Sequence, residues 1–426
     1  MGRSILYFVL TRRPSWGILI QKVRTCNREH GQREDCLYAA TRSCPAYWIK
    51  GVELMKRANL KHPSDVPVQK IRAAVLRKRG GPLKIEPLDL EGPRADEILV
   101  RLVASGICHT DIGYVDDWSS SDAPVVLGHE GAGVVEEVGT GVKGVTPGDH
   151  VVMSYQSCGR CSPCRHGRPA HCDRLYEANF GFERLDGSNA LWRSGVRGHF
   201  FGQSSFATHS LATKRNVVVV PRELPLELLA PLGCGLQTGA GTVMNSFAVP
   251  AGAGIAVFGT GAVGLAAVMA AHIVGARPII GVDIIPWRLD LALELGATHV
   301  INARREDIAA RVAGITGSGV NFVVDTTGEP ELVRMAIDLL KPKGKLALLT
   351  GDMADRSYPQ GKKAVGIAEG DAVPQRFIPK LIELHQAGHF PFDRLVKFYP
   401  FADINRAIAD ARKGDTIKPV LRIGKP

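Results

Sequence analysis

Two groups of metal-binding side chains stand out in this sequence, one dispersed and one compact. The dispersed group starts in Gly106-Ile107-Cys108-His109-Thr110-Asp111, continues at Gly128-His129-Glu130 and gains a further thiol at Cys234. A catalytic zinc ion takes three protein ligands from Cys, His or carboxylate side chains and leaves its fourth position for water or substrate. Cys108, His129 and Cys234 supply that set, so the sequence predicts an open, catalytic zinc site.

The neighbours of these ligands suggest supporting roles. Asp111 is placed in sequence to accept a hydrogen bond from the ligand His129 and so fix its tautomer. Glu130 is interpreted either as an occasional metal ligand during the exchange of water for substrate or as a buried structural carboxylate. Taken singly, Cys108 could be a small buried apolar residue and His129 a hydrogen-bonded core residue, but the combination favours metal.

The compact group lies in one stretch rich in glycine and proline. Cys158, Cys161, Cys164 and Cys172 follow the pattern Cys-x2-Cys-x2-Cys-x7-Cys. Four thiolates can close a tetrahedral shell that has no room for substrate, which predicts a structural zinc site. The alternatives are an iron–sulfur cluster, whose bacterial run has a tighter fourth spacing, and a nucleic-acid-binding zinc ribbon, which usually has two separated cysteine pairs.

A third motif predicts a dinucleotide site. Gly259-Thr260-Gly261-Ala262-Val263-Gly264 follows a strand-like run at 254–258, opens an apolar helical stretch to Val274, and precedes a second strand-like run at 279–282 that ends in Asp283. A glycine-rich turn without a ligand would not need this whole strand–turn–helix–strand–acid context.

Each residue of that motif has an expected task. Gly259, Gly261 and Gly264 allow the tight turn, the approach of the backbone to the pyrophosphate and the packing of helix on strand. Asp283 would accept hydrogen bonds from the adenosine ribose and repel a 2′-phosphate, which favours NAD over NADP. Arg288, five residues further on, could accommodate a 2′-phosphate, which weakens the predicted preference for NAD over NADP.

The elements that must position these motifs divide the chain. Short, partly alternating apolar runs from Lys70 onward predict antiparallel strands, whereas the runs after residue 254 alternate between strand-like and helix-like segments, as in a doubly wound parallel sheet. We expect an N-terminal extension at 1–69, a catalytic domain at 70–235 with a zinc lobe at 155–175, a cofactor domain at 236–368, and a return to the catalytic domain at 369–426.

Composition limits the partners. The 426 residues carry a formal net charge of +11, which could indicate nucleic acid or an anionic membrane. Residues 1–69 hold 12 Lys and Arg against 5 Asp and Glu, however, and so account for +7 of that charge. The longest apolar runs, such as 262–274, fall short of the roughly 20 residues of a membrane span. We expect neither nucleic acid nor membrane as a partner.

The extension and the cysteines bear on location. Residues 1–69 show no clear period, and we expect them to be disordered or to precede a natural start at Met55 or later, with a transit peptide as the alternative. Outside this extension all six cysteines fall in the candidate metal patterns. Thiols used as thiolates favour a reducing compartment, and we expect the cytoplasm.

From about residue 70 to the C-terminus, these motifs together resemble the zinc-dependent alcohol dehydrogenases of the medium-chain dehydrogenase/reductase superfamily. The segments Asn179-Phe180-Gly181 with Asp186-Gly187, 200–206 and 235–241 are most similar to the aryl-alcohol (benzyl-alcohol) dehydrogenase branch. The resemblance implies an α/β fold, with a GroES-like, mostly-β catalytic domain and a Rossmann cofactor domain. It also implies one catalytic and one structural zinc ion per chain, NAD, and a homo-oligomer.

The implied activity is the oxidation of primary aromatic or allylic alcohols to aldehydes, and the reverse, by hydride transfer to NAD with zinc as the Lewis acid. Thr110 would take the alcohol proton and pass it on by way of the nicotinamide ribose, and His109 would lie near the cofactor pyrophosphate. With Thr110, the candidate catalytic residues are Asp111 and Glu130.

Two departures from the family pattern matter. Many relatives place a relay histidine where this chain has Gly113, so the proton must leave through solvent or another group. The segment Asp352 to Lys363 looks shorter than in typical members, so nicotinamide contacts there are not carried over.

Three other functions compete with this one. The first is a zinc alcohol dehydrogenase of the same superfamily that acts on aliphatic alcohols or hydroxymethyl-glutathione. The second is a basic zinc-ribbon protein that binds nucleic acid, which leaves Gly259 to Asp283 unexplained. The third is a redox-sensing protein on an inactive dehydrogenase fold, against which the intact ligand set argues.

Overall fold

The computed structural model describes residues 10–12, 18–20, 68–118 and 123–425. Two compact units are present. In Met1–Pro63, strands β1 (Leu10–Arg12) and β2 (Ile18–Ile20) pair antiparallel, and the other expectations for this segment lie outside the described residues. The second unit, Ser64–Pro426, contains all three motifs. Its first strand, β3, begins at Val68, two residues before the predicted boundary.

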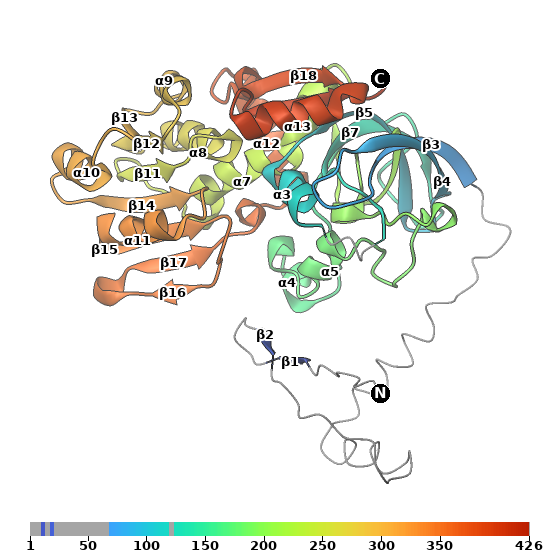
Figure 1. The fold of residues 1–426 in the computed structure, drawn as a ribbon, viewed down its shortest axis with the longest axis horizontal. Coiled ribbons are helices and arrows are strands. Elements are labelled where there is room, and N and C mark those ends of the chain that lie inside the picture. The colour runs from blue at the N-terminus through green and yellow to red at the C-terminus, as the bar shows by residue number, and fades with distance from the viewer. Residues whose placement is uncertain (1–9, 13–17, 21–67, 119–122, 426) are drawn as a thin grey trace, which may run out of the picture. The chain divides into compact units, whose positions relative to one another are not determined.

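The cysteine and histidine motifs lie in a region of mostly antiparallel strands (Figure 1). One sheet has the order β10-β8-β7-β5-β19-β18, with β9 paired to β5, and a smaller sheet has the order β4-β3-β6. The strands are β3 (Val68–Leu76), β4 (Lys84–Glu91), β5 (Glu97–Gly106), β6 (Val125–Val126), β7 (Glu130–Val138), β8 (His150–Met153), β9 (His209–Thr213), β10 (Val217–Val220), β18 (Val396–Pro400) and β19 (Lys418–Arg422).

Strand β5 is the centre of this region. It pairs with β7, β9 and β19, and nearly all of its side chains are buried. Its apolar run therefore follows from burial on both faces rather than from alternation. The strand ends at Gly106, where a Cβ atom would lie 2.0 Å from Oε2 of Glu130, so only glycine fits. This close approach brings the segment after Gly106 next to the segment after β6.

The second region is a doubly wound sheet. Its order is β13-β12-β11-β14-β15-β17-β16, and every neighbouring pair is parallel except β16 with β17. This confirms the α/β fold class. The elements are β11 (Ile255–Phe258), α8 (Ala262–Ile273), β12 (Ile279–Asp283), α9 (Pro286–Glu294), β13 (His299–Asn302), α10 (Ile308–Thr316), β14 (Val320–Asp325), α11 (Pro330–Leu339), β15 (Leu340–Leu348), β16 (Arg356–Ser357) and β17 (Lys363–Gly366).

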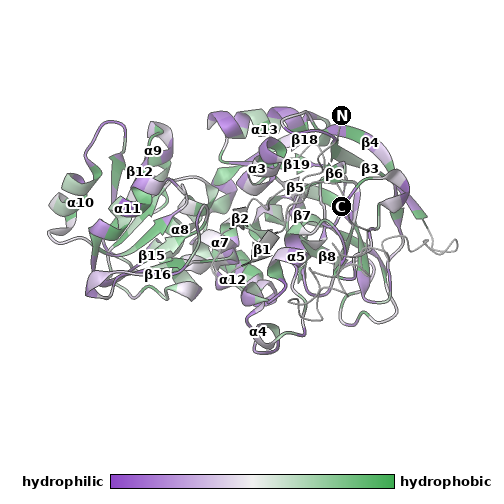
Figure 2. Ribbon diagram, turned by 60° about the horizontal axis from the view of Figure 1, so that its bottom comes forward, coloured by the Kyte–Doolittle hydropathy of each residue, from purple (hydrophilic) through white to green (hydrophobic). Residues whose placement is uncertain are grey.

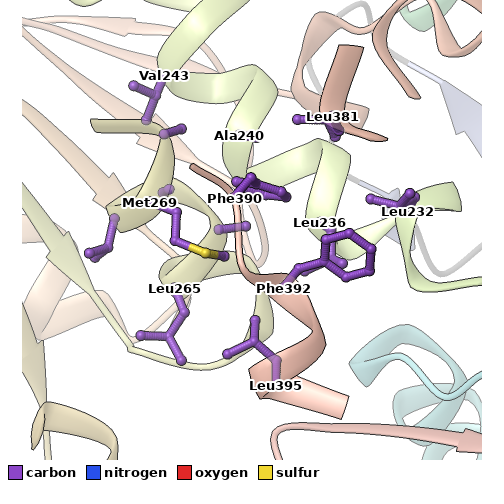
Figure 3. Packing of buried hydrophobic residues seen from close by; sticks show 14 of the residues in the cluster. Leu232, Leu236, Ala240, Val243, Leu265, Met269, Leu381, Phe390, Phe392 and Leu395 are labelled. Carbon is purple, nitrogen blue, oxygen red and sulfur yellow. The ribbon is translucent and has the colours of Figure 1, made fainter. Parts of the chain in front are cut away.

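Helix α7 (Gly235–Gly241) lies between the two regions. Figure 3 shows Leu236 and Ala240 of α7 beside Leu265 and Met269 of α8 in one apolar cluster. Burying a leucine side chain contributes about 1.5–3 kcal/mol. The two helices approach closely because a Cβ at Gly239 would lie 2.0 Å from the carbonyl oxygen of Val263.

The C-terminal part returns to the first sheet. After α12 (Pro374–Gln386), strand β18 leads to α13 (Ile404–Lys413) and β19, which pairs antiparallel with β5. The buried side chains of α13 recur at helical spacing, and the helix shows polar and apolar faces in Figure 2. Within the described ranges, no helix has the length and apolar character needed to cross a membrane.

Candidate active site

Three segments far apart in sequence meet at one buried cluster of potential metal ligands. Cys108 is the N-cap of α3 (His109–Asp117), His129 lies between β6 and β7, and Cys234 is the N-cap of α7. The ligand atoms of these three residues and of Glu130 all lie within 4.8 Å of one another, and all four residues are buried. We call these four residues the metal-ligand cluster.

Asp111 ties two members of this cluster together. Its Oδ2 accepts a hydrogen bond from the backbone N–H of Cys108 at 3.0 Å, and its Oδ1 lies 3.1 Å from Nδ1 of His129. This contact leaves Nε2 of His129 as the free ring nitrogen. Nε2 is buried and has no hydrogen-bond partner among the described residues, although buried polar atoms are normally paired. A metal ion at the cluster would resolve this, so the residues fit zinc.

The two thiols of the cluster are electrostatically unequal. A hydrogen bond from Cys234, together with the nearby His129 and Lys418, lowers the pKa of the Cys108 thiol well below its ordinary value despite burial. The same hydrogen bond and burial raise the pKa of Cys234. A divalent cation at the cluster would favour the thiolate form of both cysteines, because metal binding displaces the thiol protons.

Lys418 of β19 is a site residue that sequence reasoning missed. Its buried Nζ donates to both carboxylate oxygens of Glu130, at 2.9 and 3.0 Å, and to the carbonyl oxygen of Ile107. Glu130 also accepts from the backbone N–H of Gly235 at 3.2 Å. Burial raises the pKa of Glu130 even though the Lys418 charge opposes it. A single lysine in an apolar strand carries no signal of this pairing in the sequence.

Glu369 is a second carboxylate that the sequence did not indicate. It lies 3.6 Å from Sγ of Cys234 and accepts a hydrogen bond from Nε2 of Gln237 at 2.9 Å. Burial raises its pKa to about 7. The turn that carries it has positive φ angles at Glu369, Gly370 and Asp371, so backbone strain is concentrated beside the cluster.

Aromatic rings cover His129. The Phe201 ring stacks on the imidazole with centroids 4.3 Å apart and an interplanar angle of 21°, and Phe200 meets it edge-on at 5.4 Å. Phe180 packs edge-on against Phe201 at 5.0 Å. We call Phe200 and Phe201 the aromatic wall. In the sequence, the segment 200–206 stood out only through its resemblance to the aryl-alcohol dehydrogenase branch. Two adjacent phenylalanines by themselves are typical of a hydrophobic core.

The compact cysteine group is a separate site. Cys158, Cys161, Cys164 and Cys172 have their sulfur atoms within 4.8 Å of one another, with Cys161 as the N-cap of α4 (Ser162–Arg165). Although burial opposes it, hydrogen bonds from backbone N–H groups lower the pKa of Cys158 to about 6. Burial raises the pKa of Cys164 and of Cys172. Four cysteine sulfurs this close together suit a closed, tetrahedral zinc shell that leaves no position for substrate.

The glycine-rich loop has the geometry of a phosphate cradle. Gly259 has φ of +85°, and a Cβ at Gly264 would lie 1.8 Å from the carbonyl oxygen of Gly259. A Cβ at Gly261, by contrast, would meet nothing within 4 Å, so space is open at the N-terminus of α8 where a pyrophosphate would bind. Val263 of this loop also lies within 3.6 Å of a Cβ built at Gly235, next to Cys234. The cofactor loop and the metal-ligand cluster are therefore neighbours.

The acid after β12 is already engaged with this loop. Asp283 accepts from the backbone N–H and the hydroxyl of Thr260, at 2.7 and 2.8 Å, and from the N–H groups of Ile284 and Ile285. Arg288 is partly buried and donates to the carbonyl oxygen of Gly414 at 3.4 Å. Thr110 Oγ1 lies 3.8 Å from Sγ of Cys108, while His109 is exposed.

Comparison with known proteins agrees with this geometry. Residues 94–222 match the alcohol dehydrogenase GroES-like domain, and residues 262–366 match the zinc-binding dehydrogenase family. The chain is similar to a geraniol dehydrogenase of Castellaniella defragrans, with 45% identity over 82% of this chain and 97% of that protein. It is also similar to the crystal structure of benzyl alcohol dehydrogenase from Acinetobacter calcoaceticus, with a TM-score of 0.80, 44% identity and coverage of 84% of this chain and 100% of the other.

A further crystal structure is that of an alcohol dehydrogenase zinc-binding domain protein from Burkholderia ambifaria, with a TM-score of 0.80 and 49% identity over 84% of this chain and 100% of that one. Fold, site and relatives together define an oxidoreductase. The chain belongs to the zinc-dependent alcohol dehydrogenases of the medium-chain dehydrogenase/reductase superfamily, with a GroES-like and a Rossmann-type domain. Its cofactors are zinc and NAD(H), and its substrates are small-molecule alcohols and aldehydes.

Proposed function

We propose that this enzyme oxidises primary aromatic and allylic alcohols to aldehydes, and catalyses the reverse reaction, with NAD as the hydride acceptor. The observation that carries the proposal is the aromatic wall, because Phe201 stacks directly on a residue of the metal-ligand cluster. Phe200 is fully buried and Phe201 is 5% exposed, so Phe201 is the ring that would meet a substrate. A flat π-system against that ring gains contact area and favourable ring geometry that a short saturated chain lacks. The names of the geraniol and benzyl alcohol relatives support the same substrate class.

The chain's own residues take the following roles in this proposal. Cys108, His129 and Cys234 hold the catalytic zinc, which supplies Lewis-acid polarisation of the alcohol oxygen next to NAD. Thr110 accepts the alcohol proton. Asp111 fixes the tautomer of His129, and the four cysteines of the compact group, Cys158, Cys161, Cys164 and Cys172, hold the structural zinc.

Glu130 lies beside the proposed metal position. Its carboxylate is within ligand reach, yet Lys418 occupies both of its oxygens. We assign to Glu130 the role of a reserve ligand that the ammonium group of Lys418 keeps out of the shell. On the cofactor side, Gly259, Gly261, Gly264 and Asp283 bind NAD, with His109 near the pyrophosphate. Arg288 lies near the ribose side.

We also propose the finer organisation of the chain. The catalytic domain begins with β3 at Val68 and extends to residue 235, and the remaining boundaries are those expected from the sequence, namely 236–368 and 369–426. The protein acts in the cytoplasm, where the six unpaired cysteines of the described residues would stay reduced. It forms a homo-oligomer, which size-exclusion chromatography with light scattering would test.

A substrate panel tests the proposed activity. The purified enzyme would be assayed with NAD on benzyl alcohol, geraniol, ethanol and hydroxymethyl-glutathione. We expect kcat/KM for benzyl alcohol and geraniol to exceed that for ethanol by about 100-fold, because each contacting CH₂ or ring edge is worth 1–3 kcal/mol. Turnover confined to ethanol or hydroxymethyl-glutathione would show that a related alcohol dehydrogenase activity is the correct one.

A further inference from the structure

The aromatic wall stands on a strained turn. His199, Phe201 and Ser204 have positive φ angles of 62°, 53° and 52°. Residues with side chains are rarely found in this region, and they persist there only where the surrounding structure fixes them. The contacts that hold this turn therefore determine the positions of the Phe200 and Phe201 rings.

One side of the turn is attached to the strand that leads to His129. The backbone N–H of Phe200 donates to Oγ of Ser204 at 2.9 Å, and this hydroxyl donates to the carbonyl oxygen of Val126 at 2.7 Å. Val126 ends β6, which is followed by Gly128 and His129. These contacts therefore attach the turn to the segment that carries His129 of the metal-ligand cluster.

The other side is attached to a buried ion-pair cluster outside the active site. The Arg184 guanidinium forms two parallel hydrogen bonds to Glu97, Nε–Oε1 at 2.5 Å and Nη2–Oε2 at 3.0 Å, and a third from Nη1 to Glu91 at 2.9 Å. All three side chains are buried: Arg184 is 9% exposed, Glu97 7% and Glu91 2%. We call Arg184, Glu91 and Glu97 the arginine clamp. Glu97 is the first residue of β5, the strand that leads to Cys108.

Two hydrogen bonds, one between backbone groups and one from the backbone to an imidazole, connect the clamp to the wall. The N–H of Glu91 donates to the carbonyl oxygen of Ala190 at 2.9 Å, and the N–H of Ala190 donates to Nε2 of His199 at 3.3 Å. His199 immediately precedes Phe200. Burial, together with the nearby Arg184 charge, lowers the pKa of His199 to about 3, so its Nε2 can serve as an acceptor at neutral pH.

We propose that the arginine clamp and His199 form a positioning device that holds the aromatic wall against His129 and thereby sets the preference for flat aromatic and allylic alcohols over small saturated ones. The inference rests on the proposed function for its substrates. None of these residues belongs to the metal-ligand cluster or the cofactor loop. They act on the reaction only through Phe200 and Phe201.

The test compares Arg184→Lys with a matched control. Lysine keeps the charge but loses the two-pronged contact with Glu97. Arg77→Lys removes a two-pronged contact of the same geometry with Glu86 of β4, from a position directly after β3 on the surface. For Arg184→Lys we expect KM for benzyl alcohol to rise about tenfold, with kcat and the KM for ethanol within about twofold of the parent. The control should change none of these values.

A second variant tests the same proposal if Arg184→Lys folds poorly. His199→Asn retains a residue type that tolerates the left-handed conformation but removes the Nε2 acceptor. We expect a smaller rise in KM for benzyl alcohol, of about threefold, in the same direction. Both variants should also change the near-ultraviolet circular dichroism of the aromatic cluster, which reports the wall without any substrate.

Two results would overturn the inference. One is an equal rise in KM for benzyl alcohol and ethanol. The other is a lower unfolding temperature with unchanged KM values and an unchanged near-ultraviolet spectrum, which would make the clamp structural only. Failure of the proposed function looks different, because the parent enzyme would then be inactive on benzylic and allylic alcohols while the spectra of Arg184→Lys still test the clamp.

Discussion

The two cysteine sites of this enzyme are built in opposite ways. The compact site takes all four ligands from the stretch Cys158–Cys172, and only two of them, Cys164 and Cys172, are buried. The metal-ligand cluster draws Cys108, His129 and Cys234 from three segments and buries them all. The compact site can therefore form as soon as its own loop closes on a metal ion. The dispersed site exists only when β5, β6 and α7 already hold their places.

The comparison predicts that the loss of a ligand from the dispersed site lowers activity and leaves the fold intact. In Cys234→Ala, activity should fall by more than about 100-fold, beyond the usual cost of losing an outer-sphere partner. Zinc, measured by mass spectrometry of the pure protein, should drop by one of the two ions for which the described part of the chain has ligand groups. The unfolding temperature should change little, since the Cys234 side chain makes no capping hydrogen bond to α7.

Cys158→Ala is the variant for comparison, because it also removes one thiol and one zinc ion, but from the compact site. An unmodified enzyme with a single zinc ion, or a Cys234→Ala variant that keeps two, would end the two-site interpretation.

The compact site should show the reverse pattern. Cys164→Ser removes a buried ligand of the closed shell, and we expect the unfolding temperature to fall by roughly 10 °C, which corresponds to a loss of several kcal/mol. Calorimetry would measure this. At low temperature the folded fraction should retain most of its activity. Loss of activity without any loss of stability would mean that the two sites do not divide their tasks in this way.

The same contrast explains what the sequence could and could not predict. Cys158 to Cys172 and the loop Gly259 to Gly264 are recognisable because a local spacing carries the whole geometry. The pairing of Lys418 with Glu130 joins residues 288 positions apart, so no local pattern encodes it.

The aromatic wall was hidden for a different reason. Phe200 and Phe201 look like ordinary core residues until the left-handed turn directs Phe201 onto His129. The parallel sheet, in contrast, followed from the alternation of strands and helices after residue 254, because each of its elements is close to its neighbour in the chain.

Asp111 should give an intermediate effect, since it orients ligands without binding the metal. Asp111→Asn replaces one acceptor oxygen by a donor, which then faces the N–H of either Cys108 or Gly128. We expect the affinity of the dispersed site for zinc to fall by about 10–100-fold, measured by competition with a chelator. Asp307→Asn, at the N-cap of α10, is the matched control and should leave zinc affinity unchanged. Equal losses in both variants would point to general destabilisation.

Asp283 extends the comparison to the cofactor loop and should have a smaller effect. Asp283→Asn weakens the charge-assisted hydrogen bonds from Thr260 and removes the negative charge that disfavours a 2′-phosphate. We expect KM for NAD to rise about tenfold, equivalent to about 1.4 kcal/mol, and the preference for NAD over NADP to shrink. Steady-state kinetics with both cofactors would measure this. An unchanged preference would place the discriminating contact elsewhere, with Arg288 the first residue to test.

Gly113 should give the smallest effect, and it bears on how the proton leaves the dispersed site. A Cβ at Gly113 meets nothing within 4 Å, so Gly113→His can be accommodated on α3. An introduced imidazole accepts a proton only when neutral, above a pKa of about 6.5. If proton exit limits turnover, kcat for alcohol oxidation should rise by about twofold above that pH and match the parent below it. Gly113→Ala separates this from a helix effect, and equal kcat values at every pH would show that solvent already removes the proton fast enough.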